Sequence, residues 1–226
     1  TFVEKVRLAR ELLDKYGFSE TESILNEWNY VRGWTGDDWV YSLKSEKNIK
    51  GASFIAAVIE SCQYEPLDML MYYDARPGGM NGMFSTDLVS DILKGYYPFY
   101  AWSKMVDRGS QVAAVVKEGR GVKSDAATGV VFPAATKERA DGQYRAVAAK
   151  GEGGSLSVFV VRYAPSNDVT DTGTVVLRIP GVSLAKARCH ITDAIRTHTE
   201  VPLIHQPDGS AMFSLMPDSF ALVELD

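Results

Sequence analysis

The stretch Ile24-Leu25-Asn26-Glu27-Trp28-Asn29-Tyr30-Val31 decides how the first half of this chain is interpreted. It follows a polar connector that begins after Gly17, and its apolar start predicts a short buried strand. The carboxyl end of that strand presents the carboxylate of Glu27, an indole beside it and an amide on each side. Because parallel strands bring such ends to one edge of a sheet, we expect a functional site here.

Helical and strand-like segments alternate through the first half of the chain. The predicted elements are, in order, a helix over residues 2–16 that ends at Gly17, the strand over 24–28, a helix over about 48–63, a strand over 67–73 and a helical region over about 88–106. The run Leu67–Tyr73 is almost continuously apolar, which is typical of a parallel strand buried on both faces. Pro98 is expected near a helix start or a kink. This alternation is typical of a parallel α/β sheet.

The pattern changes near residue 109, after which short alternating strands are separated by turn signals. The predicted strands are 111–117, 144–150, 155–163, 174–179, 187–193, 211–215 and 220–225. Polar and apolar residues alternate in Ser155–Val160, so one face of that strand is expected to be exposed to solvent. This is the pattern of an antiparallel β-sandwich. We therefore expect an α/β domain over residues 1–108 and an all-β domain over 109–226.

Composition narrows the choice of partners and cofactors. With 226 residues, 46% hydrophobic and 23% charged, the chain has the composition of an ordinary globular protein. Its net charge of −5 argues against nucleic acid or an anionic membrane as a partner. Cys62 and Cys189 fall in different predicted domains and are expected to be two buried thiols. His190, His198 and His205 lack metal-ligand spacing, so no metal or other cofactor is predicted. The cellular location stays open, a secreted or periplasmic one included.

Two strands are too few for the α/β domain. With three helices they neither close a barrel nor make a good open sheet, and Leu67–Tyr73 is too apolar for a solvated edge. The missing neighbours come either from a longer polypeptide, of which this chain is a fragment, or from another chain. We favour the fragment, and we expect the uncovered surface around Leu67–Tyr73 to be unusually apolar.

The order of these segments resembles the C-terminal part of the retaining glycoside hydrolases of the clan A (β/α)8-barrel group, and of family 39 (the β-xylosidase and α-L-iduronidase type) in particular. The resemblance covers nearly the whole chain in organisation; in residues it is specific at Leu25–Asn29 and looser at Tyr96–Trp102. It implies the last two βα units of a barrel followed by a β-sandwich. The chain departs from the family at Asn26, where a small hydroxyl residue is usual, and at Met71–Asp74, where a tryptophan commonly forms the floor of the sugar site.

The resemblance assigns the role of catalytic nucleophile to Glu27. In a retaining mechanism one carboxylate attacks the anomeric carbon while a second, about 5 Å away, protonates the leaving oxygen. The second carboxylate would lie on the fourth barrel strand, upstream of Thr1, so this chain alone is expected to be inactive. Asn26-Glu27 could instead be the Asn-Glu pair of a fourth strand, which makes Glu27 the acid/base. We disfavour this alternative because only one further strand precedes the sandwich.

Residues that contact a carbohydrate are predicted around the same two strand ends. Aromatic faces stack on the C–H faces of pyranose rings, and amides and charged groups bond to hydroxyls. The candidates are Asn26, Trp28, Asn29, Trp34, Tyr72, Tyr73, Asp74 and Arg76. Core packing is the alternative for the aromatic residues. Arg76 suits a substrate carboxylate or an ion pair with Asp74, and Asp37 and Asp38 are expected in a solvated acidic loop.

Two other functions compete with a glycoside hydrolase. One is a non-catalytic carbohydrate-binding or scaffold module in which the sandwich does the binding, and the other is a barrel that has lost its activity. A binding module predicts a row of exposed aromatic residues on the sandwich. Its strands carry few, Phe159, Tyr163, Phe213 and Phe220, and alternation turns most of them inward. The sequence therefore favours the hydrolase and leaves the sugar and the linkage open.

Overall fold

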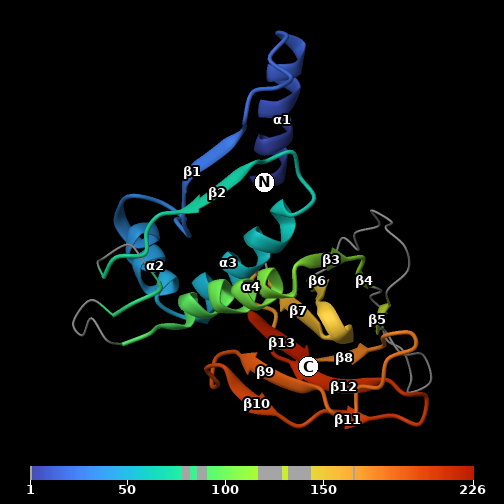
Figure 1. The fold of residues 1–226 in the computed structure, drawn as a ribbon. Helices are drawn as coiled ribbons and strands as arrows, with labels where there is room; N and C mark the ends of the chain where they lie inside the picture. The colour runs from blue at the N-terminus through green and yellow to red at the C-terminus, as the bar shows by residue number, and fades with distance from the viewer. Residues whose placement is uncertain (1, 78–81, 86–90, 117–128, 132–143, 165) are drawn as a thin grey trace. The chain divides into compact units, whose positions relative to one another are not determined.

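The computed structural model describes residues 2–77, 82–85, 91–116, 129–131, 144–164 and 166–226 (Figure 1). The chain divides into two compact units, Thr1–Tyr96 and Tyr97–Asp226, which are described separately below. Among the described residues, the first unit contains helices and a small parallel sheet, and the second contains one α-helix and two larger sheets. No helix in the described part of the chain has the length and hydropathy needed to cross a membrane.

The first unit follows the predicted alternation of helix and strand. Its elements are α1 (Phe2–Lys15), β1 (Ile24–Trp28), α2 (Gly36–Glu46), α3 (Ile49–Cys62), β2 (Met69–Tyr72) and the short 3₁₀ helix η1 (Lys94–Tyr96). The helix α1 ends before Gly17, whose φ of +84° is a conformation that glycine adopts freely. At the start of α3, the Asn48 side chain accepts a 2.8 Å hydrogen bond from the backbone N–H of Lys50. The predicted parallel pairing of the two strands is confirmed, since Ile24 lies opposite Met69.

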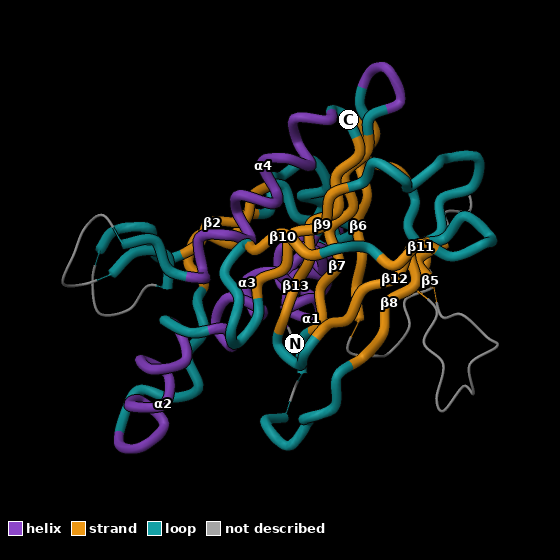
Figure 2. The backbone as a smooth tube through the Cα atoms, turned by 90° about the horizontal axis from the view of Figure 1, so that it is seen from below, coloured by secondary structure: helices purple, strands orange, loops and turns teal. Residues whose placement is uncertain are grey.

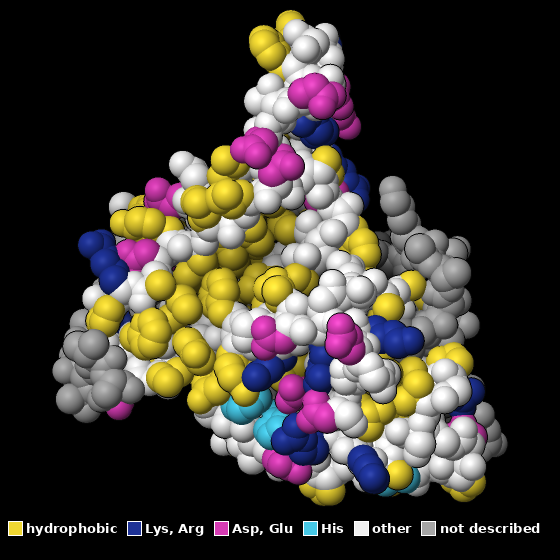
Figure 3. All heavy atoms as spheres, viewed as in Figure 1, with side chains coloured by type: hydrophobic (Ala, Val, Ile, Leu, Met, Phe, Trp, Pro, Cys, Tyr) yellow, Lys and Arg dark blue, Asp and Glu magenta, His cyan; other side chains and the backbone are white. Residues whose placement is uncertain are grey.

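Two predictions about the first unit were wrong. The stretch that contains Asp37, Asp38 and Trp39 forms α2 rather than a loop. The strand over Leu67–Tyr73 is not buried on both faces, because Met69 and Met71 are 43% and 46% exposed. Among the described residues the sheet of the first unit consists of β1 and β2, and the face of β2 that carries Met69 and Met71 is left uncovered. The apolar surface that we expected around this strand is therefore present, as Figure 3 shows over β1 and β2.

The second unit begins with α4 (Tyr97–Arg108), and Pro98 lies in its first turn, as expected near a helix start. The helix was predicted from about residue 88. Residues 86–90 lie outside the described residues, and Ile92 forms an isolated antiparallel bridge with Phe84 instead of a helical turn.

Two sheets form neighbouring layers in the second unit (Figure 2). The first has the order β10 (Thr199–Val201), β9 (Arg188–Thr192), β13 (Ser219–Leu225), β7 (Leu156–Arg162), β6 (Tyr144–Lys150) and β3 (Ser110–Val112). The second has the order β11 (Ile204–His205), β12 (Ala211–Leu215), β8 (Gly173–Leu177), β5 (Gly129–Val131) and β4 (Val115–Val116). A short 3₁₀ helix, η2 (Glu152–Gly154), joins β6 to β7. Both sheets contribute to one core, in which Val160 and Leu177 are buried. All pairs are antiparallel except β5 with β8, which is parallel.

The prediction that one face of the strand over 155–160 is wet was wrong. Every residue of β7 is buried, because α4 packs against β6 and β7 and covers the face of the sheet opposite the core. The polar residue Ser157 on β7 accepts a 2.9 Å hydrogen bond from the Arg108 side chain of α4. This packing also places α4 with the sheets, whereas the sequence pattern suggested a division near residue 109.

The two cysteines are confirmed as buried free thiols, Cys62 on α3 and Cys189 on β9. Burial raises the pKa of the Cys189 thiol to about 12. Both side chains therefore act as small apolar core residues.

Two histidines and two tyrosines form a stacked cluster in the second unit. The ring of His198, in the turn before β10, lies 4.5 Å from the ring of His190 on β9 with nearly parallel planes. Tyr97 of α4 also stacks on His198 at 5.2 Å, and Tyr100 meets it edge-on at 4.9 Å. Burial and, to a smaller extent, the neighbouring His190 lower the pKa of His198 to about 4. His198 therefore stays neutral in the folded chain over most of the acidic range.

We expect this cluster to make the second unit less stable in acid. Between pH 6.5 and about 4, His198 is protonated in the unfolded chain but not in the folded chain. The free energy of unfolding therefore falls as the pH falls through this range. Urea unfolding at pH 7 and pH 4.5 measures this loss. His198→Asn, which tolerates the φ of +45° at this position, should shrink the difference between the two pH values. The same change at His205, which is exposed, should leave it as it is. An unchanged difference in His198→Asn would contradict this account.

Candidate functional site

A β-bulge places Asn26 and Glu27 on the surface at the carboxyl end of β1. Leu25 lies opposite Leu70 and Trp28 opposite Tyr72, so β1 uses one more residue than β2 between the two pairs. Such an extra residue bends a strand and re-aims its side chains, and bulges are frequent beside active sites. Both Asn26 and Glu27 are exposed. Glu27 therefore lies exposed at the uncovered sheet of the first unit.

Trp28 lies beneath this strand end, in the core of the first unit. Its side chain is 4% exposed and contacts the rings of Phe2, Phe54 and Tyr72 at centroid distances of 6.1, 6.2 and 5.1 Å. Its indole Nε1 has no hydrogen-bond partner among the described residues. The backbone of Tyr73 donates a 2.9 Å hydrogen bond to the Trp28 carbonyl, which joins the ends of the two strands. The structure thus brings these strand ends together and places the indole under them rather than beside Glu27.

The end of β2 carries the remaining predicted residues. Tyr72 is half-buried, and burial raises the pKa of its phenol, while a backbone hydrogen bond from Gly82 acts in the opposite direction. Tyr73 is exposed, and the peptide bond between Tyr73 and Asp74 is cis. Asp74 is half-buried and forms a 2.7 Å ion pair with Arg76, one of the two partners that the sequence offered for this arginine. Asn29, after β1, is half-buried.

Trp34 lies in the loop between β1 and α2. Its indole is 65% exposed and stacks on that of Trp39 at 5.6 Å with an interplanar angle of 23°. Among the described residues, no ring contact of Trp34 with Tyr72 or Tyr73 is found. The predicted aromatic residues are therefore divided between the strand ends and the start of α2.

Glu46, at the end of α2, is a buried carboxylate that the sequence gave no reason to single out. It is 1% exposed, and neither of its oxygens has a hydrogen-bond partner among the described residues. Burial raises its pKa to about 7, against the opposing charge of Lys47. Its charge also raises the pKa of Tyr72, and a Cβ atom on Gly82 would lie 1.9 Å from the Glu46 carbonyl oxygen. This residue is therefore packed tightly behind the end of β2.

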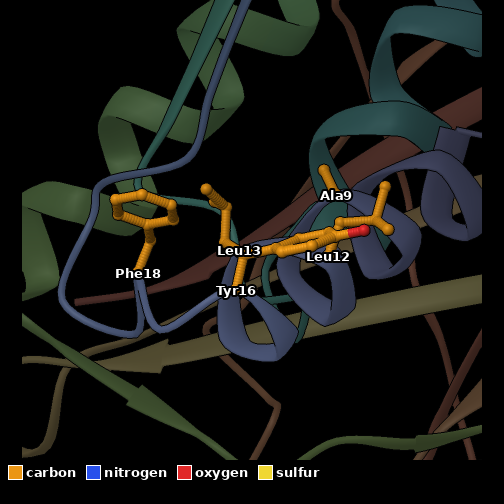
Figure 4. A pocket seen from close by; sticks show the side chains of 5 residues that line it. All are labelled: Ala9, Leu12, Leu13, Tyr16 and Phe18. Carbon is orange, nitrogen blue, oxygen red and sulfur yellow. The ribbon is translucent and has the colours of Figure 1, made fainter.

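An apolar pocket lies elsewhere in the first unit, at the end of α1 (Figure 4). It is lined by Ala9, Leu12, Leu13, Tyr16 and Phe18, and the hydroxyl of Tyr16 is its one polar side-chain group. α1 leads into the amino end of β1, so the pocket belongs to the end of the sheet opposite Glu27. It offers no group that could act as an acid, base or nucleophile at neutral pH. Among the described residues, no group of three or more His, Cys, Asp or Glu side chains could hold a metal ion.

The chain matches no protein-family model, and no curated protein sequence matches it. Solved structures are similar in fold. A glucosidase from Croceicoccus marinus matches with a TM-score of 0.62 and 14% identity over 99% of this chain and 49% of its own. A family 30 endoxylanase from Clostridium papyrosolvens matches with a TM-score of 0.58 and 12% identity over 95% of this chain and 44% of its own. A family 51 α-L-arabinofuranosidase from Thermotoga petrophila matches with a TM-score of 0.56 and 14% identity over 99% of this chain and 47% of its own.

At these identities the likeness shows the fold alone. The chain shares its fold with glycoside hydrolases of families 30, 44 and 51, and it spans less than half the length of the three structures described above. Membership of family 39 in particular stays a prediction.

Proposed function

We propose that this chain is the C-terminal section of a retaining glycoside hydrolase and that Glu27 is its nucleophile. The observation that carries the proposal is the exposed carboxylate on a bulge at the carboxyl end of a parallel strand. In enzymes built on (β/α)8 barrels the chemistry lies at this end of the strands. The similarity in fold to glycoside hydrolases supports the same reading of the site.

The chemistry follows from one carboxylate here and a second one elsewhere. Glu27 attacks the anomeric carbon as the bond to the leaving oxygen breaks, and a covalent glycosyl-enzyme forms. The second carboxylate, about 5 Å away, protonates the leaving oxygen and then removes a proton from the water that releases the sugar. Asp74 is a poor candidate for this second group because Arg76 holds it as an ion pair. The resemblance places the acid/base on the fourth barrel strand, and we propose that position for it.

The other residues at the strand ends have supporting roles. Asn26 and Asn29 can bond to sugar hydroxyls, and the rings of Tyr72 and Tyr73 can contact the C–H face of a pyranose. Asp74 and Arg76 form a charged edge to the site. Trp28 packs beneath the strand end and holds it in place, so its role is to position Glu27 rather than to touch the sugar.

The uncovered apolar surfaces of the first unit support a larger fold. We propose that β1 and β2 are the last two strands of a (β/α)8 barrel and that the second unit is a β-sandwich. Further βα units of the same polypeptide would cover Ile24, Met69 and Met71 on the sheet, and the pocket along α1 (Figures 3 and 4). This chain covers less than half of each matched structure, which agrees with such a remainder.

A non-catalytic binding module is less well supported. Of the aromatic residues on the predicted sandwich strands, Phe159, Phe213 and Phe220 are buried, and Tyr144 and Tyr163 are half-buried. The described strands of the second unit therefore lack the exposed aromatic row on which such a module would depend.

Hydrolysis of aryl glycosides by the intact protein tests the proposal. We expect the first product, followed by NMR, to have the same anomeric configuration as the substrate. Residues 1–226 alone should not turn over the substrate, since they carry one of the two carboxylates. An inverted product would contradict the retaining mechanism. Robust hydrolysis by residues 1–226 that is abolished by Glu27→Gln would contradict the proposal that the second carboxylate lies outside these residues.

A further inference from the structure

Trp34 is a largely exposed aromatic residue of the first unit. It is the most exposed of the four tryptophans, and it lies in the loop that follows the strand carrying Glu27. An exposed indole presents apolar area to water, and a ligand that covers this area gains free energy in proportion to it. The question is which ligand its geometry suits.

The loop holds Trp34 in a fixed place. The backbone N–H of Arg32 donates a 2.8 Å hydrogen bond to the Ser42 hydroxyl, which donates in turn to the Asp38 carbonyl at 2.7 Å. Arg32 also forms a 2.8 Å ion pair with Asp38. A Cβ atom on Gly33 would lie 2.8 Å from the Cβ of Asp38, so the loop approaches α2 as closely as a glycine permits.

The indole itself is supported from behind. It stacks on Trp39 of α2, which is half-buried and so fixes the plane of the outer ring. A side chain that is already ordered loses little conformational entropy when a ligand binds to its free face. The platform formed by Trp34 and Trp39 is therefore built before any ligand arrives.

The surroundings of the platform favour a carbohydrate over a protein. The residues that follow, Thr35, Gly36, Asp37 and Asp38, are all exposed and carry no apolar bulk. A protein partner buries a contiguous apolar patch with few charges at its centre. A pyranose has one apolar C–H face to place on the indole and a rim of hydroxyls that can bond to the carboxylates of Asp37 and Asp38.

We propose that Trp34, backed by Trp39, binds a sugar ring beyond the one that Glu27 attacks. The natural substrate is then a chain of several linked sugars rather than a glycoside of a single sugar. This inference rests on the proposed function for the place of the cleaved bond, but the platform itself can be tested without any turnover.

The test compares long and short substrates of the intact protein. Xylohexaose and cellohexaose serve as long substrates, and the aryl glycosides of xylose and glucose as short ones. Trp34→Ala should lower the ratio of kcat/KM for the long substrate to that for the short one by roughly tenfold, the loss expected for one aromatic stacking contact. Trp34→Phe, which keeps a flat ring, should restore part of the ratio. Val40→Ala, at an exposed apolar residue of the neighbouring helix α2, is the matched control and should leave the ratio unchanged.

An unchanged ratio in Trp34→Ala would overturn the inference, and so would an equal loss on both substrates. If the wild-type protein hydrolyses neither substrate, the proposed function fails, and binding decides the platform separately. Quenching of tryptophan fluorescence by the hexasaccharides in Glu27→Gln protein, weakened roughly tenfold by Trp34→Ala, would support the platform. Absence of binding, or equal binding by Trp34→Ala, would refute it.

Discussion

Replacement of Glu27 by alanine in the intact protein is expected to lower kcat by several orders of magnitude without unfolding the protein. The carboxylate forms the covalent intermediate, so no other group can replace it in the first step. The side chain is exposed, and its removal leaves no cavity in the core. Thermal unfolding of the variant should match the wild type, and Glu22→Ala, at an exposed glutamate just before β1, is the control for the loss of an exposed carboxylate.

Azide then distinguishes the two roles that a glutamate can have here. Without the Glu27 carboxylate, azide can attack the vacated face of the anomeric carbon while the acid still protonates the leaving group, and the glycosyl azide has inverted configuration. If Glu27 were the acid/base, its loss would spare good leaving groups in the first step, and azide would attack the covalent intermediate. The product would then have retained configuration, and β1 could not be the second-to-last strand of the barrel.

Glu46→Gln is expected to stabilise the first unit by up to about 3 kcal/mol above pH 7. Burial raises the pKa of Glu46 to about 7 from its ordinary value of 4.5, and each pKa unit corresponds to about 1.4 kcal/mol. Below pH 4.5 the carboxyl group is protonated in both the folded and the unfolded chain. Between pH 4.5 and 7 the unfolded chain loses the proton first, so the free energy of unfolding falls as the pH rises and levels off above pH 7. Glutamine mimics the protonated group at every pH.

Urea unfolding at pH 4 and pH 8 measures this effect. The midpoint of Glu46→Gln should equal that of the wild type at pH 4 and exceed it at pH 8. Glu22→Gln, at an exposed glutamate, should change neither midpoint. If Glu46→Gln and the wild type lost stability equally between the two pH values, Glu46 would not be the group that titrates. This dependence has the opposite sign to that of His198, so the first unit is weakened towards alkaline pH and the second towards acidic pH.

The sequence predicted those elements in which apolar spacing and turn residues agree. The apolar period of Phe2–Lys15 and the stop at Gly17 were sufficient for α1, and the strands β6 and β12 have the predicted bounds. The helix α2 was missed because its buried residues, Ser42, Ser45 and Glu46, are all polar, so no apolar stripe marks it. The strands β5, β10 and β11 have two or three residues each, too few to show a period.

The candidate site was predicted in part for the same reasons. Residue types placed Glu27 and Asn26 at a strand end, and the ion pair of Asp74 with Arg76 was one of two predicted partners. The bulge that exposes Glu27 depends on the register between β1 and β2, which the sequence of either strand alone does not contain. An indole suits both a protein core and a sugar site, so the sequence could not distinguish these two places for Trp28. In the structure its ring packs against Phe54 and Tyr72 in the core of the first unit.

Trapping of the covalent intermediate tests the central claim most directly. The intact protein is treated with 2-deoxy-2-fluoroxylosyl and 2-deoxy-2-fluoroglucosyl fluorides. The fluorine at C2 slows both steps, and the fluoride leaving group speeds the first, so the glycosyl-enzyme accumulates. Peptide mass spectrometry should then find one fluoroglycosyl group on the peptide that contains Glu27, and no label on Glu27→Gln protein. A label on another carboxylate, with Glu27 unmodified, would contradict the assignment of this residue as the nucleophile.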